Sequence, residues 1–154
     1  MIETPDIIQT EAQAAAVIHL TIARSEMMKE FGPAAGELMA ALAAQGVQPL
    51  GAIFTHHLKM SRDAFDFELG VKIASPVKPA GRVKPGELPK VKAARTIYHG
   101  AYEGLPSAWG EFDNWLRANG HEQAGSLWEV YLAGPQSTPN PADWRSELVR
   151  PLKN

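Results

Sequence analysis

The sequence predicts an α+β fold. A β-α-β-β module occurs twice and forms one antiparallel sheet, with two helices on one face and a concave ligand cleft on the other. Two observations indicate this arrangement. Apolar residues and glycines recur along the chain at a nearly constant shift of 74, and each copy alternates between strand-like and helix-like apolar periods. We expect a single domain over residues 1–154, with pseudo-repeats at about 7–73 and 91–152.

The first copy begins with a strand, because Ile18, Leu20 and Ile22 alternate with more polar residues. A helix is expected after Ser25, a suitable N-cap, and Gly46 stands where a helix end favours a left-handed residue. Its apolar positions follow helical spacing: Phe31, Ala35, Leu38 and Leu42. Two further strands, GAIFTHHLK (51–59) and DAFDFELGVKI (63–73), complete the module. Alternating apolar residues in the last strand share one face.

The second copy follows residues 74–90, which are rich in proline and glycine and are predicted to be a connection. Residues 96–99 repeat residues 21–24 at a shift of 75, and the helical apolar positions repeat at a shift of 74. GSLWEVY then matches GAIFTHH, and SELVRPL matches FELGVKI at a shift of 79. The change from 74 to 79 predicts a five-residue insertion in the loop 134–144.

Composition excludes several classes of protein. Apolar residues make up 45% and charged residues 21% of the chain, which is typical of globular proteins. The net charge is −2, and Lys, Arg, Asp and Glu are spread along the whole chain. The sequence therefore indicates no basic face for direct contact with nucleic acid. The chain has no cysteine, its N-terminus does not resemble a signal peptide, and no apolar run is long enough to span a membrane. We therefore expect a cytoplasmic protein.

A module of one helix on three strands leaves the other face of its strands bare, and that face is the expected ligand site. Strand alternation places Glu129 and Tyr131 on it, with Trp128 and Val130 on the helix side, like Phe54. The other candidate residues on the bare face, or at its rim for the tryptophan, are Tyr98, Glu147, His57 and Trp144. Ile97 is assigned to the core, as the counterpart of Ile22, and the aromatic stripe of the second helix (Trp109, Phe112, Trp115 and Leu116) is assigned to plain core packing.

Carboxylates among aromatic rings suit a flat aromatic or cationic organic molecule, since aromatic faces attract positive charge. The same groups suit catalysis, with Glu129 as acid or base and Tyr98 or Tyr131 assisting. No metal is expected, because His56 and His57 are adjacent strand residues that face opposite sides. No cofactor is expected either, since the chain has neither a P-loop nor a dinucleotide-binding glycine motif.

Four segments of the chain stand out together: FDFELGVKI (65–73), HGAYEGLPSAWGEFDNWLRANG (99–120), WEVYLAGP (128–135) and WRSELVRPL (144–152). In this order and spacing they resemble the GyrI-like, AraC-type effector-binding domains. The resemblance covers essentially the whole chain and implies the same duplicated fold. It also implies that Glu129 takes the place of the acidic pocket residue that meets cationic drugs, with Tyr131 beside it and Trp144 as a lining aromatic.

The chain has no segment for the helix-turn-helix that a transcription regulator of this family needs, so we expect a stand-alone member. Three functions then compete. The first is binding of a xenobiotic or effector, the second is hydrolysis of cyclopropane-bearing DNA alkylators by a Glu/Tyr pair, and the third is modulation of a protein partner such as DNA gyrase. All three are typical of proteins in bacterial stress or detoxification.

Overall fold

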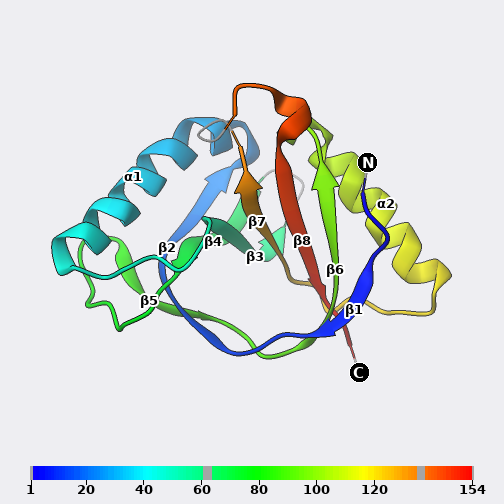
Figure 1. Ribbon diagram of the computed structural model, residues 1–154, viewed down its shortest axis with the longest axis horizontal. Coiled ribbons are helices and arrows are strands. Elements are labelled where there is room, and N and C mark those ends of the chain that lie inside the picture. Colours follow the sequence, from blue (N-terminus) through cyan, green and yellow to red (C-terminus); the bar gives the residue numbers. More distant parts are fainter. Residues whose placement is uncertain (1, 61–63, 135–137, 154) are drawn as a thin grey trace. The chain divides into compact units, whose positions relative to one another are not determined.

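The computed structural model describes residues 2–60, 64–134 and 138–153. Within them the α+β class is confirmed, since two α-helices accompany eight antiparallel strands (Figure 1). The helices are α1 (Met27–Gln45) and α2 (Leu105–Ala118). The strands are β1 (Asp6–Gln9), β2 (Gln13–Ala23), β3 (Phe54–Met60), β4 (Ala64–Lys72), β5 (Val83–Leu88), β6 (Lys92–His99), β7 (Leu127–Ala133) and β8 (Arg145–Pro151).

The chain divides into two compact units. One comprises Met1–Thr10 and Val91–Asn154, and the other comprises Glu11–Lys90. The same order of elements occurs in both. It is β2-α1-β3-β4 in the unit Glu11–Lys90, which is the first module in sequence, and β6-α2-β7-β8 in the other unit, which is the second module. The order of paired strands is β3-β4-β2-β5 in one unit and β1-β6-β8-β7 in the other. The structure therefore shows the β-α-β-β repeat that the sequence predicts.

The two edge strands are exchanged between the modules. β1 precedes the first module in sequence but pairs with β6 of the second, and β5 precedes the second module but pairs with β2 of the first (Figure 1). The prediction that 74–90 is only a connection is wrong, because it contains β5. Pro85 is tolerated there because an edge strand does not need its amide. Gly86 is also required, since a Cβ at that position would lie 2.8 Å from Val17 Cγ2.

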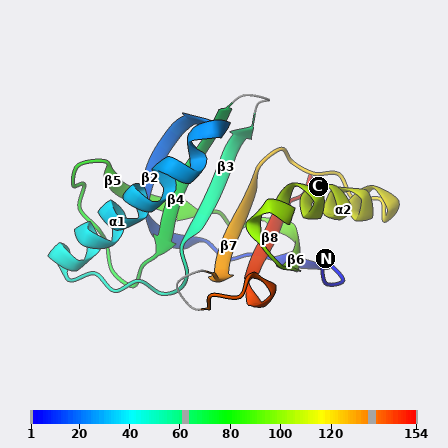
Figure 2. The same cartoon turned by 90° about the horizontal axis from the view of Figure 1, so that it is seen from above.

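The unit of residues 11–90 packs α1 against one face of its strands (Figure 2). The residues expected to share a face of β4 are confirmed as core, and they meet Leu38 and Leu42 of the helix. Gly46 ends α1 in the left-handed region at φ 67°. Ser25, expected to cap the helix, instead lies in a 3-10 turn (Arg24–Glu26) before it.

The other unit packs α2 against β6 and β8 through Phe112 and Leu116, which are 0% and 1% exposed. These residues stand 74 positions after Leu38 and Leu42, so the helix repeat is confirmed. Gly120 follows α2 at φ 75°, matching Gly46 at the same shift. Tyr98 also belongs to this core, with a side chain 6% exposed.

The shift of 75 expected for the first strand is wrong. Ile18 pairs with Leu69, and Thr96 pairs with Leu148, so Thr96 stands 78 positions after Ile18. The shift of 79 for the last strand is confirmed by the neighbouring strand, because Thr55 and Glu129, which are 74 positions apart, pair with Leu69 and Leu148. The difference between 75 and 78 is odd, and a shift by an odd number of residues moves every side chain of a strand to the other face. Tyr98, and not Ile97, therefore faces α2.

The faces assigned to β7 are also wrong. Glu129 pairs with Leu148 and Tyr131 with Ser146, which places both on the α2 side, whereas Trp128 pairs with Val149 on the opposite face. The matching of Trp128 with Phe54 holds, because Phe54 likewise lies on the face opposite its helix, across from Gly70. Both side chains are buried, so apolar character alone did not distinguish the two faces.

The face opposite each helix, expected to be bare, carries buried apolar residues. On this face of the unit 11–90, Val17 and Phe54 are each 1% exposed, and in the other unit Trp128 and Val149 are 4% and 2% exposed. Strands buried on both faces carry near-continuous apolar runs, as in AAAVIHL (14–20). The loop 134–144, in which a five-residue insertion is expected, contains residues 135–137, which lie outside the described residues.

Candidate functional site

Glu129 is a carboxylate held by two aromatic side chains on the α2 face of its unit. Its side chain is 8% exposed. The Tyr131 hydroxyl donates to Oε1 over 2.7 Å, and the Trp109 indole Nε1 donates to Oε2 over 2.6 Å. Hydrogen bonds to an ionised acceptor are short and strong, and a buried carboxylate requires them. The two donors therefore hold the Glu129 side chain in a defined position.

Local structure explains how these residues meet. Glu129 and Tyr131 are two apart on β7, so their side chains stand on the same face of the strand. A bulge between Tyr131 and Ala133 follows directly, and Leu132 in it is 49% exposed. Trp109 comes from the second turn of α2. Helix and strand thus each supply a donor to one acid.

Two aromatic ring contacts extend the site away from Glu129. The Tyr102 ring lies 5.6 Å from that of Tyr131 at 63°, and 4.9 Å from that of Trp144 at 40°. Trp144 is anchored, because its indole donates to the Thr138 carbonyl over 2.9 Å and its own carbonyl accepts from the Gly100 amide. The three rings form a continuous aromatic cluster, which we call the Tyr102 cluster (Tyr102, Tyr131 and Trp144).

The electrostatics of the site are those of a negative charge among aromatic rings. Burial raises the pKa of the Tyr102 phenol, and the negative charge of Glu129 raises it further. On the Trp109 side, the Arg150 guanidinium lies 5.3 Å from the ring centroid. Asp113 pairs with Arg150 through Oδ2 and Nη2 at 3.1 Å. This salt bridge gives Arg150 a carboxylate partner other than Glu129.

The structure brings together three of the predicted site residues: Glu129, Tyr131 and Trp144. Tyr98 lies on the same face, but its hydroxyl donates to the Ala101 carbonyl over 2.7 Å. Glu147 lies on the opposite face of the strands, where its Oε2 accepts from Arg95 Nε at 2.5 Å. Glu147 is therefore separated from Glu129 by the sheet itself.

His57 belongs to the other unit and occupies the position equivalent to Tyr131. It pairs with core Phe67, stacks on that ring at 5.2 Å, and contacts the Thr55 hydroxyl over 3.2 Å. Thr55 and Glu129 pair with the equivalent Leu69 and Leu148, so both modules carry a hydrogen-bonded pair at these two positions. His57 is 4% exposed and packs as a core residue of its unit.

Sequence reasoning missed two members of the site, Trp109 and Tyr102. Trp109 was assigned to plain core packing because it lies on the apolar stripe of α2. The signal that would have separated it from Phe112 is its indole N–H, since a buried tryptophan needs an acceptor. For Tyr102 the sequence contains no equivalent signal, because it lies outside the strands and helices that periodicity detects.

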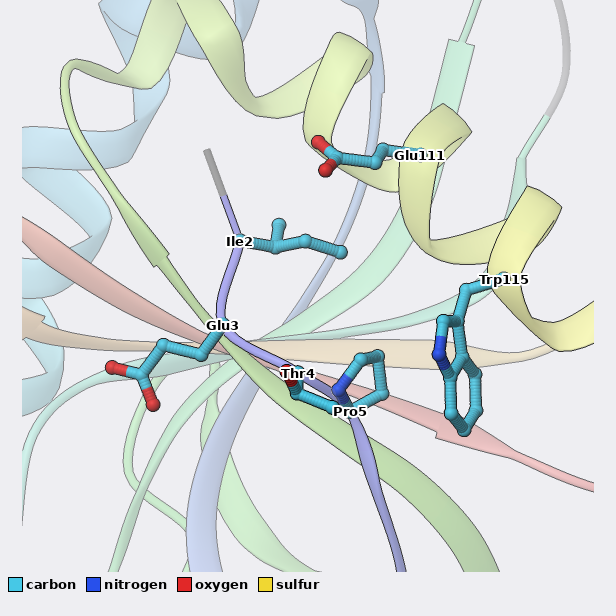
Figure 3. A pocket seen from close by; sticks show the side chains of 6 residues that line it. All are labelled: Ile2, Glu3, Thr4, Pro5, Glu111 and Trp115. Atoms are coloured by element: carbon cyan, nitrogen blue, oxygen red, sulfur yellow. The ribbon is translucent and has the colours of Figure 1, made fainter.

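A separate hollow lies on the same unit between the N-terminal segment and α2. Six residues line it: Ile2, Glu3, Thr4, Pro5, Glu111 and Trp115 (Figure 3). The Glu3 carboxylate is held by His99, with 2.7 Å between Oε2 and Nε2. The Glu3 side chain points away from Trp115 (Figure 3). None of the residues predicted for the ligand site lines this hollow.

Within the described part of the chain, histidine and acidic side chains do not gather in threes with the geometry of a metal site. Neither of the helices described has the length and apolarity required to cross a bilayer.

The comparison with family models decides the relationship that the sequence motifs indicate. Residues 3–153 match the model of the GyrI-like small molecule binding domain. The chain belongs to this family. As a GyrI-like domain it is a small-molecule binding domain, and the predicted resemblance is confirmed over nearly its whole length. A comparison with curated proteins found no match.

Solved structures share this GyrI-like fold at low sequence identity. The EcmrR C-terminal domain is 20% identical with a TM-score of 0.85, and 98% of each chain is covered. In the EcmrR-DNA complex the identity is 19% and the TM-score 0.85; the match covers 99% of this chain but only 58% of the EcmrR chain. The GyrI-like domain therefore spans little more than half of that relative.

Two other similar structures have different descriptions. A hydrolase from Listeria innocua is 14% identical with a TM-score of 0.70, and 97% of this chain and 91% of that chain are covered. SAV2435, solved with tetraphenylphosphonium bound, is 10% identical with a TM-score of 0.65; 99% of this chain and 95% of that chain are covered. At these identities the likeness concerns the fold alone.

Proposed function

We propose that this GyrI-like domain binds aromatic cations at Glu129. The observation that carries the proposal is the buried Glu129 carboxylate, held by the Trp109 indole and the Tyr131 hydroxyl beside the Tyr102 cluster. Both donors are neutral, so these two contacts position the carboxylate without cancelling its charge. A cation placed against it gains Coulomb energy that grows as water is excluded.

The aromatic rings supply the second part of the recognition. A cation over the face of a tyrosine or tryptophan is attracted by the ring quadrupole, by about 0.5–2 kcal/mol per contact. Tyr102 and Trp144 are half-buried and lie outside the sheet, on a 3-10 turn and at the end of a loop. The SAV2435 structure with tetraphenylphosphonium supports the same ligand class, because it pairs this fold with an aromatic cation.

The test compares Glu129→Gln with wild type by titration calorimetry, using tetraphenylphosphonium as the cationic probe and triphenylphosphine oxide as a neutral one. Loss of the charge should weaken the binding of tetraphenylphosphonium by about 1–3 kcal/mol. The affinity for the neutral probe should stay nearly unchanged. Glu147→Gln is the matched control, since it removes the same charge from the opposite face and should affect neither probe. An equal effect of both substitutions would show that only net charge matters.

A hydrolase is the second candidate, and the 2.7 Å hydrogen bond between Tyr131 and Glu129 favours it. A carboxylate that holds a tyrosine hydroxyl provides an acid/base pair for water attack on a strained ring, and the Listeria neighbour described as a hydrolase shares the fold. The test is to incubate the protein with a cyclopropane-bearing alkylator and follow the products by mass spectrometry. For a hydrolase, Glu129→Gln should keep binding but lower turnover by roughly 10²–10⁴-fold.

A further inference from the structure

Ser146 is a fully buried hydroxyl beside the Glu129 site. It is 0% exposed, and its Oγ has no hydrogen-bond partner within residues 2–60, 64–134 and 138–153. A buried polar group without a partner costs stability, and such a group in a folded protein requires an explanation. The hydroxyls of the two neighbouring tyrosines donate elsewhere, that of Tyr131 to Glu129 and that of Tyr98 to the Ala101 carbonyl.

The position of Ser146 places it at the edge of the Tyr102 cluster. It lies directly opposite Tyr131 on β7 and Tyr98 on β6, on the face that α2 covers. Trp144 precedes it by two residues in extended backbone, so the two side chains stand on the same side. One small hydroxyl thus lies among three large aromatic side chains, close to the carboxylate end of the site.

We propose that Ser146 is a second polar contact of the ligand site, and that the molecule recognised there is an aromatic cation carrying a hydroxyl or carbonyl group away from its charge. This rests on the proposed function, because Glu129 binds the cationic centre. A serine hydroxyl donates and accepts, so it serves either group.

The competing explanation is that Ser146 is a small residue whose hydroxyl has no role. The two explanations differ in what Ser146→Ala does. Under both, the variant should melt at or above the temperature of wild type, because an unpartnered hydroxyl is removed. Only under the proposal does the variant also lose discrimination between ligands with and without a polar group.

The experiment uses two matched probes and the full chain: tetraphenylphosphonium, and (4-hydroxyphenyl)triphenylphosphonium. Wild type should bind the hydroxylated probe roughly three- to tenfold more tightly, the range for one hydrogen bond. Ser146→Ala should abolish this advantage while keeping tetraphenylphosphonium affinity within about twofold. Ser146→Cys, close in size but a weak hydrogen-bonding group, should behave in the same way if the alanine variant folds poorly.

Thr96→Val is the control, since Thr96 is a buried hydroxyl on the same face but donates to the Glu3 carbonyl over 2.7 Å. It should lower stability and leave the advantage of the hydroxylated probe intact. The same advantage in Ser146→Ala as in wild type, or none in wild type, would overturn the inference alone, provided that both probes bind and depend on Glu129. If neither probe binds wild type, the proposed function fails and this inference fails with it.

Discussion

Trp109 of α2 donates its indole N–H to Glu129 of β7, with 2.6 Å between Nε1 and Oε2. The contact joins the helix to the strand through one charged acceptor, and the Arg150 guanidinium lies over the same indole ring. Trp109 is therefore both a packing residue and a partner of the proposed ligand-binding acid. Packing and hydrogen bonding at this position can be separated by substitution.

Trp109→Phe keeps an aromatic ring but removes the N–H. We expect the free energy of unfolding to fall by about 1–3 kcal/mol, because Glu129 loses a donor while it stays buried. Affinity for tetraphenylphosphonium should hold or rise, since the carboxylate becomes freer to face the cation. Chemical denaturation and calorimetry measure the two quantities. Trp115→Phe on the same helix is the control, and an equal loss of stability there would mean that ring size alone matters.

Phe112 is the central core residue of α2, with 0% of its side chain exposed. Phe112→Ala should lower the free energy of unfolding by about 3–5 kcal/mol, through lost burial and the cavity left behind. Thermal unfolding followed by circular dichroism provides the measurement. Glu111→Ala, at the exposed position beside it, should change stability little. A small effect of Phe112→Ala would contradict the packing of α2 on β6 and β8.

Gly86 and Gly70 are both required by close approach, but for different reasons. A Cβ at Gly86 would meet only Val17 among its nearest atoms, whereas a Cβ at Gly70 would meet the Ala16 carbonyl oxygen at 2.8 Å. Gly86→Ala should destabilise the protein by about 1–3 kcal/mol, and adding Val17→Ala should recover part of that loss in a double-mutant cycle. In Gly70→Ala the same second substitution should recover little of the lost stability, because the Ala16 carbonyl oxygen belongs to the backbone and cannot move aside as a side chain can. Equal rescue in both cycles would refute this distinction.

Tyr102 predicts the behaviour of the site at alkaline pH. Its pKa is raised above the ordinary value of 10.0, first by burial and then by Glu129. A phenol whose folded pKa is raised contributes stability that is present below pH 10 and is lost as the pH rises through the folded pKa. Tyr102→Phe should therefore show a smaller alkaline loss of stability than wild type.

Glu129→Gln should lower the pKa of Tyr102 toward its ordinary value but not restore it fully, because burial remains. Tyrosinate absorbance, taken as the difference between each protein and its Tyr102→Phe counterpart, reports this ionisation. Glu147→Gln should leave it unchanged, since Glu147 lies on the opposite face and is paired with Arg95. A shift of the same size in both glutamine variants would show that Glu129 does not act on Tyr102 locally.

The acid at the centre of the site was predictable from the sequence, but its surroundings were not. Glu129, Tyr131 and Trp144 were found from motifs and strand spacing, and the structure brings them together. Glu147 was grouped with them because alternation was counted from the wrong face of β7. Trp109 was set aside as core because a helical stripe of aromatic residues does not show which member has a polar partner.

What the sequence determined by itself was the duplicated β-α-β-β order, the buried stripes of both helices and the glycines that end them. These are local properties, since helical spacing and left-handed glycines depend on neighbours within a few residues. Only the tertiary structure decided which face of β6 and β7 meets α2, and where β1 and β5 pair. The strands are apolar on both faces, so their pattern is compatible with either orientation. The pairing of Thr96 and Glu129 with Leu148 removes this ambiguity, because register sets the side of every residue in a strand.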